Sequence, residues 1–287
     1  MPSRPLLAVD RPNLLFRAFF ALPRTITGPD ERPRNALLGT ANLILQAVER
    51  YDPRAVVLCD GAEAATYRKE LLPRYHADRP PLDEDLGHQF ELSEDFFGAL
   101  GWTTLIHDTL EADDLLGSLA TKETEAGGSA LLFTGDRDMF QCASDAVHVL
   151  WPGGKSGPEE LGPADVRKRY GIPPALVPDF IALRGDPSDG IPGAKGIGEK
   201  TAGEILRVHG DLETAIENAA AERPRVAAAL RNQAEELRDY RKMATLQPIP
   251  VACPSDAPTA FGAAAQAVSA LGMGRLAERL ERMARKE

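Results

Sequence analysis

The sequence has few cysteines and no long apolar run, and these two absences exclude several classes of protein. Its 287 residues include only three cysteines, Cys59, Cys142 and Cys253. Because their number is odd and their spacings are unrelated, they fit reduced thiols better than a disulfide framework or a zinc site. No apolar run approaches the roughly 20 residues of a membrane-spanning helix. The first apolar run, residues 6–9, is also too short for the core of a signal peptide.

Positive charge is scarce as well, since the chain has 33 Lys and Arg but 43 Asp and Glu, which gives a net charge of −10. This balance argues against a partner bound by bulk basicity, which is how proteins hold nucleic acid without specific contacts. It remains compatible with phosphate chemistry through metal ions that gather several of the acids. With 43% hydrophobic residues, we expect a soluble cytoplasmic protein of one large or two modest domains, and a monomer by default.

Acids follow short apolar runs at three places. Asp10 ends the run 6–9, Asp60 ends the run 55–59, and Asp136 and Asp138 follow the run 130–133 and a glycine. These runs predict buried strands, and open α/β proteins place their sites at the carboxyl ends of such strands. A close pair of carboxylates usually has a cation between its members. Asp and Gly are also ordinary turn residues, so one such motif leaves both interpretations open.

The regions between the acids predict further elements. We expect Asn35 to cap a helix that runs to Tyr51, and residues 147–151 to form a fifth strand at the edge of the sheet. Glu111, Asp113 and Asp114 open a helix predicted to end near residue 125, and three acids in four residues exceed what the helix dipole needs. Helices are also predicted at 159–170, 175–183, 219–237 and 271–283.

Two segments suggest contacts with phosphate. Residues 61–81 mix basic and aromatic side chains, and composition alone favours a solvated helical face over a substrate contact. Asp186 and Asp189 precede glycines at 193, 196 and 198, and a helix is predicted to start near residue 199. Glycines before a helix expose backbone amides that can hold a phosphate without reading its base. The acids before this loop and the Lys200-Thr201 pair after it make the signal more specific.

Together these motifs resemble the 5′-nuclease family, which comprises the 5′→3′ exonuclease domain of bacterial DNA polymerase I, stand-alone bacterial and phage 5′ nucleases, and flap endonucleases. The resemblance runs from about residue 6 to residue 246 and suggests a free-standing member. It rests on segments in a fixed order: Asp10 with Phe16-Arg17-Ala18, Asp60 with Tyr67-Arg68 and 75–81, then 111–114, 134–139 and 185–202. It implies an α/β, PIN-like (Rossmann-like) fold whose mostly parallel central sheet is flanked by helices, with a helical arch and a C-terminal helix–three-turn–helix subdomain.

The resemblance also implies a division of the chain. Residues 1–157 would form the catalytic domain, with the arch at about 61–90. Residues 158–247 would form the DNA-binding helix–three-turn–helix region, and 248–287 a tail with a closing helix.

The resemblance further implies a metal centre. A first ion would be held by Asp10, Asp60, Glu111 and Asp113, and a second by Asp136, Asp138, Asp186 and Asp189, with Asp114 in support. Because all of these ligands are hard oxygens, Mg²⁺ or Mn²⁺ is expected, as two or three ions. The implied reaction is a two-metal hydrolysis, in which one ion activates a water and the other stabilises the leaving 3′ oxygen.

The implied substrate is DNA with 5′ flaps, nicks or ends, or an RNA–DNA hybrid. Arg17 would approach the scissile phosphate, and the arch would contribute Arg68, Lys69, Arg74, His76 and Arg79, of which Arg68, His76 and Arg79 would join Arg17 in catalysis. The duplex phosphates would be held by Gly193, Lys195, Gly196, Gly198, Lys200 and Thr201, with K⁺ on the carbonyls of that loop.

Two residues depart from the family pattern. Arg11 follows Asp10 where members usually have glycine, and we expect it to narrow or reshape the path of the 5′ strand. His76 stands where a lysine usually follows the tyrosine of the arch. These departures keep open a catalytically weak junction-binding protein. A PIN-like ribonuclease is a third possibility, but the 185–202 loop argues against it because such a clamp is not part of a minimal PIN domain.

A His76→Lys variant is expected to show a flatter dependence of DNA cleavage on pH than the wild-type chain. Histidine loses its positive charge between about pH 6 and pH 8, whereas lysine keeps its charge. Wild-type cleavage should therefore fall more steeply over this range, after correction for hydroxide formation. Cleavage rates of a 5′-labelled flap across the range test this, and superimposable profiles would remove His76 from the proposed role.

Overall fold

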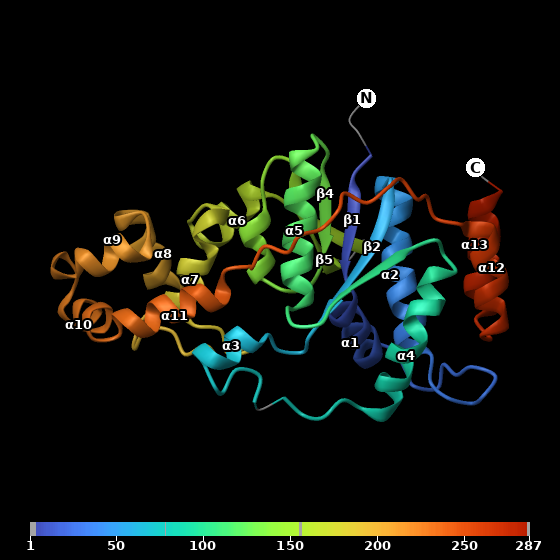
Figure 1. Ribbon diagram of the computed structural model, residues 1–287, viewed down its shortest axis with the longest axis horizontal. Coiled ribbons are helices and arrows are strands. Elements are labelled where there is room, and N and C mark those ends of the chain that lie inside the picture. The colour runs from blue at the N-terminus through green and yellow to red at the C-terminus, as the bar shows by residue number, and fades with distance from the viewer. Residues whose placement is uncertain (1–3, 78, 155–156, 286–287) are drawn as a thin grey trace.

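A computed structural model describes residues 4–77, 79–154 and 157–285. Asp78, which belongs to the predicted arch, lies outside the described residues. The molecule is elongated: a sheet lies near its middle, most helices of the second half of the chain lie at one end, and the last two helices lie at the other (Figure 1). In the described part of the chain, no helix is long and apolar enough to cross a membrane.

Six strands form the sheet, in the order β3-β2-β1-β4-β5-β6. Their bounds are β1 (Leu6–Asp10), β2 (Ala55–Gly61), β3 (Thr103–His107), β4 (Ala130–Phe133), β5 (Val147–Gly154) and β6 (Gly157–Leu161). The first five are parallel, and β6 pairs with β5 in the antiparallel direction. The predicted α/β fold with a mostly parallel sheet is therefore confirmed.

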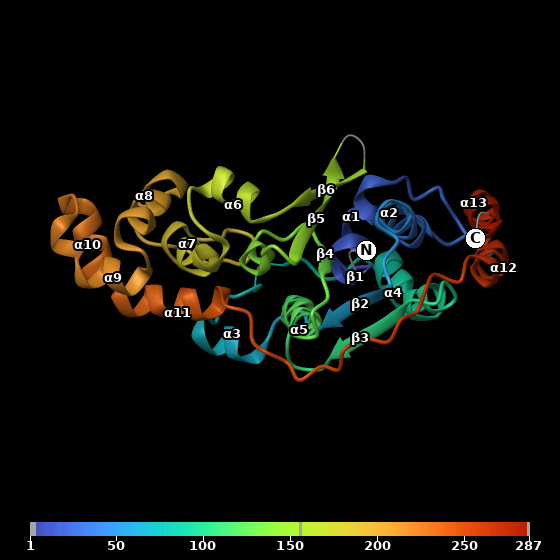
Figure 2. The same ribbon diagram turned by 90° about the horizontal axis from the view of Figure 1, so that it is seen from above.

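Both faces of the sheet are covered, which explains why the inner strands are apolar throughout rather than alternating. Helices α1 (Arg11–Ala21), α2 (Asn35–Tyr51) and α4 (Glu84–Gly98) cover the face that carries Leu7 and Val9, and α5 (Ala112–Glu125) covers the face that carries Leu6 and Ala8. Figure 2 shows α5 on one side of the strands and α1 and α2 on the other.

The helical end of the molecule is continuous with the core on the α5 side of the sheet. Phe140, Tyr170 and Phe180 form a chain of aromatic contacts, with ring centres 6.1 and 4.8 Å apart, that leads from the sheet into this region. Its helices are α6 (Pro163–Tyr170), α7 (Val177–Arg184), α8 (Glu199–His209), α9 (Leu212–Glu217), α10 (Pro224–Asn232) and α11 (Ala234–Ala244). The short α3 (Thr66–Leu71) lies against α11, and 3₁₀ turns occur at Asp138–Cys142, Pro174–Leu176 and Ala219–Ala221.

After α11 the chain returns along the sheet and ends at the far side of the molecule (Figure 1). Ala257 N donates to Arg54 O at 2.9 Å, and Ala260 N donates to Leu100 O at 2.8 Å. Helices α12 (Phe261–Ala270) and α13 (Gly274–Ala284) then pack their apolar sides into the core shared by α2 and α4. The expected tail with one closing helix is therefore a pair of helices, because 261–270 is helical as well.

Four of the predicted elements are wrong in detail. The strand at 147–151 is not an edge strand, since β6 pairs outside it and occupies part of the predicted helix 159–170. The predicted helix 219–237 is broken into a 3₁₀ turn and two helices, one of which begins at Pro224. Asn35 begins its helix without capping it, and its amide donates instead to the carbonyl oxygens of Phe19 and Leu22.

Candidate active site

The carboxyl ends of β1, β2 and β4 lie side by side, and each delivers an acid to the same sheet edge. Asp10 ends β1 opposite Cys59, so Asp60 lies one residue further along the neighbouring strand. Asp136 follows β4, which pairs with the other side of β1. The parallel order of these strands therefore brings together acids from distant parts of the chain, as the sequence predicted.

Backbone and hydroxyl contacts fix the ends of β1 and β4 relative to each other. Thr134 Oγ1 donates to Asp10 Oδ2 at 2.7 Å, and Asn13 N donates to Asp10 Oδ1 at 3.0 Å. Asn13 Oδ1 accepts from Gly135 N at 3.0 Å, which joins the start of α1 to the loop after β4. Contacts within the protein thus hold Asp10 in position without a bound ion.

A close backbone contact fixes β2 against the start of α5. Ala62 N donates to Leu110 O at 2.9 Å. A Cβ atom on Gly61 would collide with that same carbonyl oxygen. Because nothing separates the two backbones here, Asp60 and Glu111 keep a fixed spacing.

The pKa values of four acids show that they share one region of negative charge. Burial, and then the charge of Asp60, raises the pKa of Asp10 to about 6. Burial raises the pKa of Asp136 to about 7, and the charges of Asp189, Asp10 and Asp186 add to this effect. Burial raises the pKa of Asp113 well above its usual range, with further increases from Asp136 and Asp10. Asp138 shifts in the same direction, first through burial and then through Asp136 and Asp189.

Other predicted acids have cationic partners. Arg11 pairs with Asp60, and Arg184 pairs with Asp186 at 2.9 Å. Asp189 Oδ1 lies 3.1 Å from His76 Nε2 and 3.7 Å from Arg79 Nη2. Among the residues that the structure describes, no Lys, Arg or His pairs with the four acids of raised pKa, which are Asp10, Asp113, Asp136 and Asp138.

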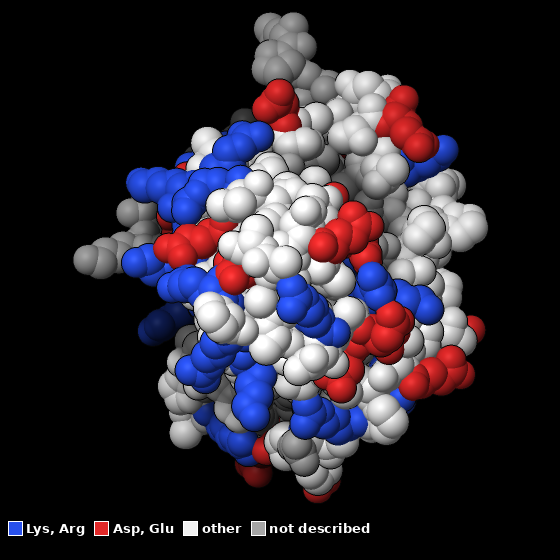
Figure 3. All heavy atoms as spheres, turned by 90° about the vertical axis from the view of Figure 1, so that its left-hand side faces the viewer, with Lys and Arg blue, Asp and Glu red and all other residues white. Residues whose placement is uncertain are grey.

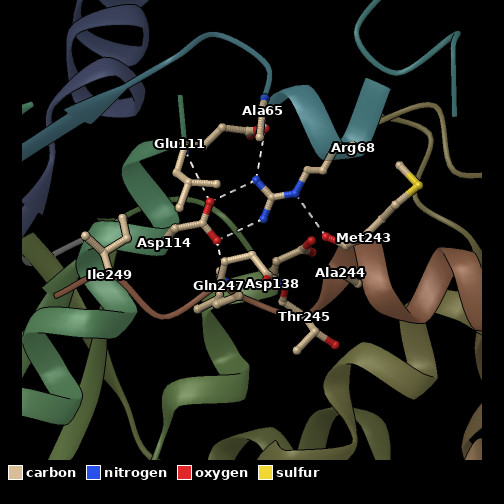
Figure 4. Close-up of polar contacts among 12 residues, drawn as sticks. Ala65, Arg68, Glu111, Asp114, Asp138, Met243, Ala244, Thr245, Gln247 and Ile249 are labelled. Carbon is tan, nitrogen blue, oxygen red and sulfur yellow. Dashed lines mark hydrogen bonds and ion pairs between the residues drawn. The ribbon is translucent and has the colours of Figure 1, made fainter. Parts of the chain in front are cut away.

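Arg68 is the centre of a buried network that joins three elements (Figure 4). Its guanidinium lies 2.9 Å from Glu111 Oε1 and makes two contacts of 3.2 Å with Asp114, which is fully buried. Its Nε donates to Met243 O at 3.0 Å, and Gln247 N donates to Asp114 Oδ1 at 2.7 Å. The network therefore ties α3 and α5 to the end of α11.

This placement of Arg68 differs from both interpretations of the 61–81 segment. The side chain is 5% exposed, so it belongs neither to a solvated face nor to a surface that a phosphate reaches directly. Asp114 faces Arg68, which agrees with a supporting role for that acid. Sequence reasoning missed the network because its partners lie about 45 and 175 positions away along the chain.

His76 extends from the segment after α3 toward the acids of the second half of the chain. Its backbone has a φ of 55°, which a residue other than glycine seldom adopts. Its ring stacks on Tyr75 with centres 3.8 Å apart, and its Nδ1 lies 2.8 Å from Glu63 O. Tyr75 donates its hydroxyl to Glu111 Oε2 at 2.9 Å. The two neighbouring aromatic residues therefore contact acids of both predicted metal groups.

The donor chemistry of the cluster fits a hard divalent cation. Its predicted ligands are all carboxylates. In the described chain, the four that lack a cationic partner have raised pKa values, first because they are buried and then because neighbouring carboxylates repel them, although the charge of Arg68 partly offsets this at Asp113 and Asp138. As the side chains lie, no three His, Cys, Asp or Glu residues within the described ranges form a group that could hold a metal ion. The assignment of particular ligands stays a prediction.

Most of the predicted phosphate contacts lie on the surface of the molecule. Arg17 is exposed, and its guanidinium lies so close to Gly153 that a Cβ atom there would be 2.8 Å from Nη2. Lys69, Arg74, Arg79, Lys195 and Lys200 are also exposed, and Thr201 is half-buried. Figure 3 shows Lys and Arg side chains gathered along one side and the lower part of the helical end. Basic side chains are therefore exposed on this surface, although the chain is acidic as a whole.

The glycine loop before α8 forms the predicted turn, but only part of it is exposed: Gly196 and Gly198 are exposed, whereas Gly193 is buried. Gly193 and Gly196 have φ values of 69° and 81°, and Gly198 is the residue that precedes the first turn of α8. A Cβ atom on Gly193 would collide with the backbone of Gly185, whereas one on Gly198 would meet open space. The loop is thus closed on its inner side and open at the helix N-terminus.

Two family models match consecutive parts of the chain. The 5′-3′ exonuclease N-terminal resolvase-like domain matches residues 5–171, and the 5′-3′ exonuclease C-terminal SAM fold matches residues 172–258. Among curated relatives, DNA polymerase I of Mycobacterium tuberculosis is 36% identical over 252 residues, which are 86% of this chain and 28% of the polymerase. Thermostable DNA polymerase I of Thermus filiformis is 40% identical over 217 residues, 76% of this chain and 25% of the polymerase. The chain spans less than a third of these relatives.

Solved structures share the fold. The T5 5′-exonuclease with bound zinc superposes with a TM-score of 0.72 at 18% identity, covering 97% of this chain and 99% of that one. A bacteriophage T5 flap endonuclease in complex with DNA and metal ions gives 0.71 at 20% identity, covering 98% and 100%. The catalytic core of Rad2 with a DNA substrate gives 0.57 at 13% identity, covering 89% and 83%.

The raised pKa values predict how stability depends on pH in the absence of divalent ions. Because Asp10 and Asp136 titrate near 6 and 7 when folded and near 4 when unfolded, the folded chain holds more protons between about pH 4 and pH 7. Its free energy of unfolding should therefore fall as pH rises through this window. In an Asp136→Asn variant the fall should be smaller by roughly 1 to 3 kcal/mol. Urea unfolding in EDTA tests this, and equal slopes for the two proteins would contradict it.

An Arg68→Leu variant should lose about 3 to 5 kcal/mol of unfolding free energy, because it leaves the buried Asp114 without its cationic partner. Lys69→Leu is the matched control: the neighbouring side chain is exposed, and its loss should change stability by no more than about 0.5 kcal/mol. Both are measured by urea unfolding. If Arg68→Leu is as stable as the control, the guanidinium does not hold the three elements together.

Proposed function

Because the chain belongs to the 5′-3′ exonuclease family, we propose that it is a metal-dependent, structure-selective 5′ nuclease that hydrolyses phosphodiesters of DNA. The observation that carries the proposal is the group of four acids at one sheet edge, near the exposed Arg17, for which the described part of the chain provides no cationic partner. Buried charges of one sign are costly, and a protein that keeps them together without compensation commonly does so for a cation.

We assign the residues of the cluster to separate tasks. Asp10 and Asp113, with Asp60 and Glu111, would face one ion, and Asp136 and Asp138, with Asp186 and Asp189, would face a more open one. Two such ions would supply an activated water and stabilisation of the leaving oxygen when bound. Arg17 would contact the phosphate that is cut, since the residue is exposed and its guanidinium lies near Gly135, in the loop after β4, and near Gly153 of β5.

The substrate we propose is a 5′ flap, nick or end of DNA, with RNA–DNA hybrids as a further class. The open N-terminus of α8 offers backbone amides at Gly196 and Gly198, and Lys195 and Lys200 lie exposed beside it. Such a surface holds the backbone of a duplex without reading its sequence. The carbonyls of the same loop are where a K⁺ would bind. The exposed Lys69, Arg74 and Arg79 would guide the single strand toward the acids, and His76 would contact it there.

A second candidate function is supported by the cationic partners of the other acids. Arg11, Arg184 and Arg79 pair with acids that the family resemblance assigns to metal ions, and His76 contacts the same acid as Arg79. A protein with fewer available ligands would bind junctions and cleave them slowly. The two functions differ in whether bound DNA is cut.

One assay separates these functions from the PIN-like ribonuclease. The protein is incubated with Mn²⁺ and a 5′-labelled flap, a nicked duplex or a single-stranded RNA. Short 5′ products from the first two substrates support the nuclease, and tight binding without cleavage supports the junction-binding protein. Cleavage of RNA alone would overturn both in favour of the ribonuclease.

An Asp136→Ala variant should cleave the flap at least about 100-fold more slowly than the wild-type chain, because it removes a carboxylate from the ion-binding group. Its affinity for the flap should be equal or higher, since negative charge facing the phosphate is lost. Asp145→Ala is the matched control, an exposed aspartate elsewhere on the surface that should leave both quantities unchanged. Cleavage by Asp136→Ala at the wild-type rate would show that the metal assignment is wrong.

A further inference from the structure

Arg11 is a buried cation inside the group of acids. It directly follows Asp10 as the first residue of α1, and it is 6% exposed. Its Nη2 makes the ion pair with Asp60 Oδ2. A buried arginine usually has a fixed partner because desolvation of an unpaired guanidinium is costly. Asp60 is that partner here.

Helix α4 holds the Arg11 guanidinium in place from the other side. Its Nη1 donates to Ser93 Oγ at 3.0 Å, and its central carbon lies 5.9 Å from the centre of the Phe90 ring. Ser93 Oγ is itself fixed, because it donates to Phe90 O at 2.7 Å. The guanidinium cannot leave Asp60 without giving up these contacts as well.

Both carboxylate oxygens of Asp60 accept a hydrogen bond within the protein. Oδ2 accepts from Arg11, and Oδ1 accepts from Gly61 N at 2.7 Å. Asp10 and Asp136, the predicted ligands at the neighbouring strand ends, have no such partner: no Lys, Arg or His in the described part of the chain pairs with either carboxylate. Among the acids at the ends of β1, β2 and β4 in the described chain, Asp60 therefore has a cationic partner, whereas Asp10 and Asp136 have none.

From this geometry we infer that Arg11 is an internal counter-cation that withdraws Asp60 from ion binding and weakens the affinity of the cluster for a divalent ion. The guanidinium competes with the ion for the same carboxylate, and its positive charge repels an ion held by the adjacent acids. The inference rests on the proposed function, because it concerns the same acids. It leaves Asp10 and Asp113 as the acids without a cationic partner in the described chain that would face the first ion, and it does not change the assignment of Asp136 to the second.

Mn²⁺ binding to the whole chain without DNA tests this inference, with free Mn²⁺ measured by electron paramagnetic resonance. Arg11→Gln removes the charge but keeps hydrogen-bonding groups, and it should bind Mn²⁺ at least about 10-fold more tightly than the wild type. Arg11→Lys keeps the charge and should stay within about 3-fold of the wild type.

Arg54→Gln is the matched control for the loss of a buried pair. Arg54 precedes β2 at the end opposite Asp60, and its Nε donates to the buried Glu123 at 2.9 Å. This variant should be less stable than the wild type and should bind Mn²⁺ with unchanged affinity. A tighter binding shared by Arg54→Gln and Arg11→Gln would overturn the inference, because loosening of the fold would then explain it.

Asp60→Asn provides a test that does not require replacement of Arg11. If Asp60 is withdrawn from the ion, this variant should lose less than about 3-fold in Mn²⁺ affinity, whereas Asp136→Asn should lose at least about 10-fold. Equal losses would overturn the inference and leave the proposed function intact. A wild-type chain and Arg11→Gln variant that both bind no Mn²⁺ would overturn the inference and the proposed metal dependence together.

Discussion

Repulsion among carboxylates at one sheet edge is the constraint on which the rest of the site depends. Parallel pairing of β1 with β2 and β4 forces Asp10, Asp60 and Asp136 into one small volume, and α5 adds Asp113. The fold resolves this in two ways. Some acids receive an arginine or histidine, and others stay without a cationic partner in the described chain and have pKa values well above those of exposed aspartates.

The two kinds of acid have different positions in the architecture. The paired acids Glu111 and Asp189 contact residues of the segment after β2, so they connect the catalytic sheet to the parts of the chain that would meet the substrate. Arg68 extends the connection to the end of α11, so the helical end and the sheet do not contribute to the site independently.

Much of the fold and the membership of the acidic cluster could be predicted from the sequence, because both follow from local patterns. A buried strand that ends in an acid has a recognisable composition, and parallel strands bring their ends together. The pairing of charges could not be predicted. The sequence shows that Arg11 and Arg68 are present, but it does not show their partners. Arg11 contacts Ser93 because α1 packs near α4, and Arg68 contacts Asp114 because α3 lies near α5. Strand β6 was missed because its polar residues lack a strand pattern and its pairing with β5 is tertiary.

The contact between Gly61 and the Leu110 carbonyl oxygen has a consequence for how this site could diversify. Two backbones touch there without an intervening side chain, so the spacing between Asp60 and Glu111 is fixed. Any side chain at Gly61 would collide with the Leu110 carbonyl oxygen, so a substitution there cannot increase this spacing in small steps. The charge around these two acids can therefore be changed more readily by a group that enters from a neighbouring element than by a change in the strand itself. Arg11 is such a group, because it enters from the start of α1 and pairs with Asp60.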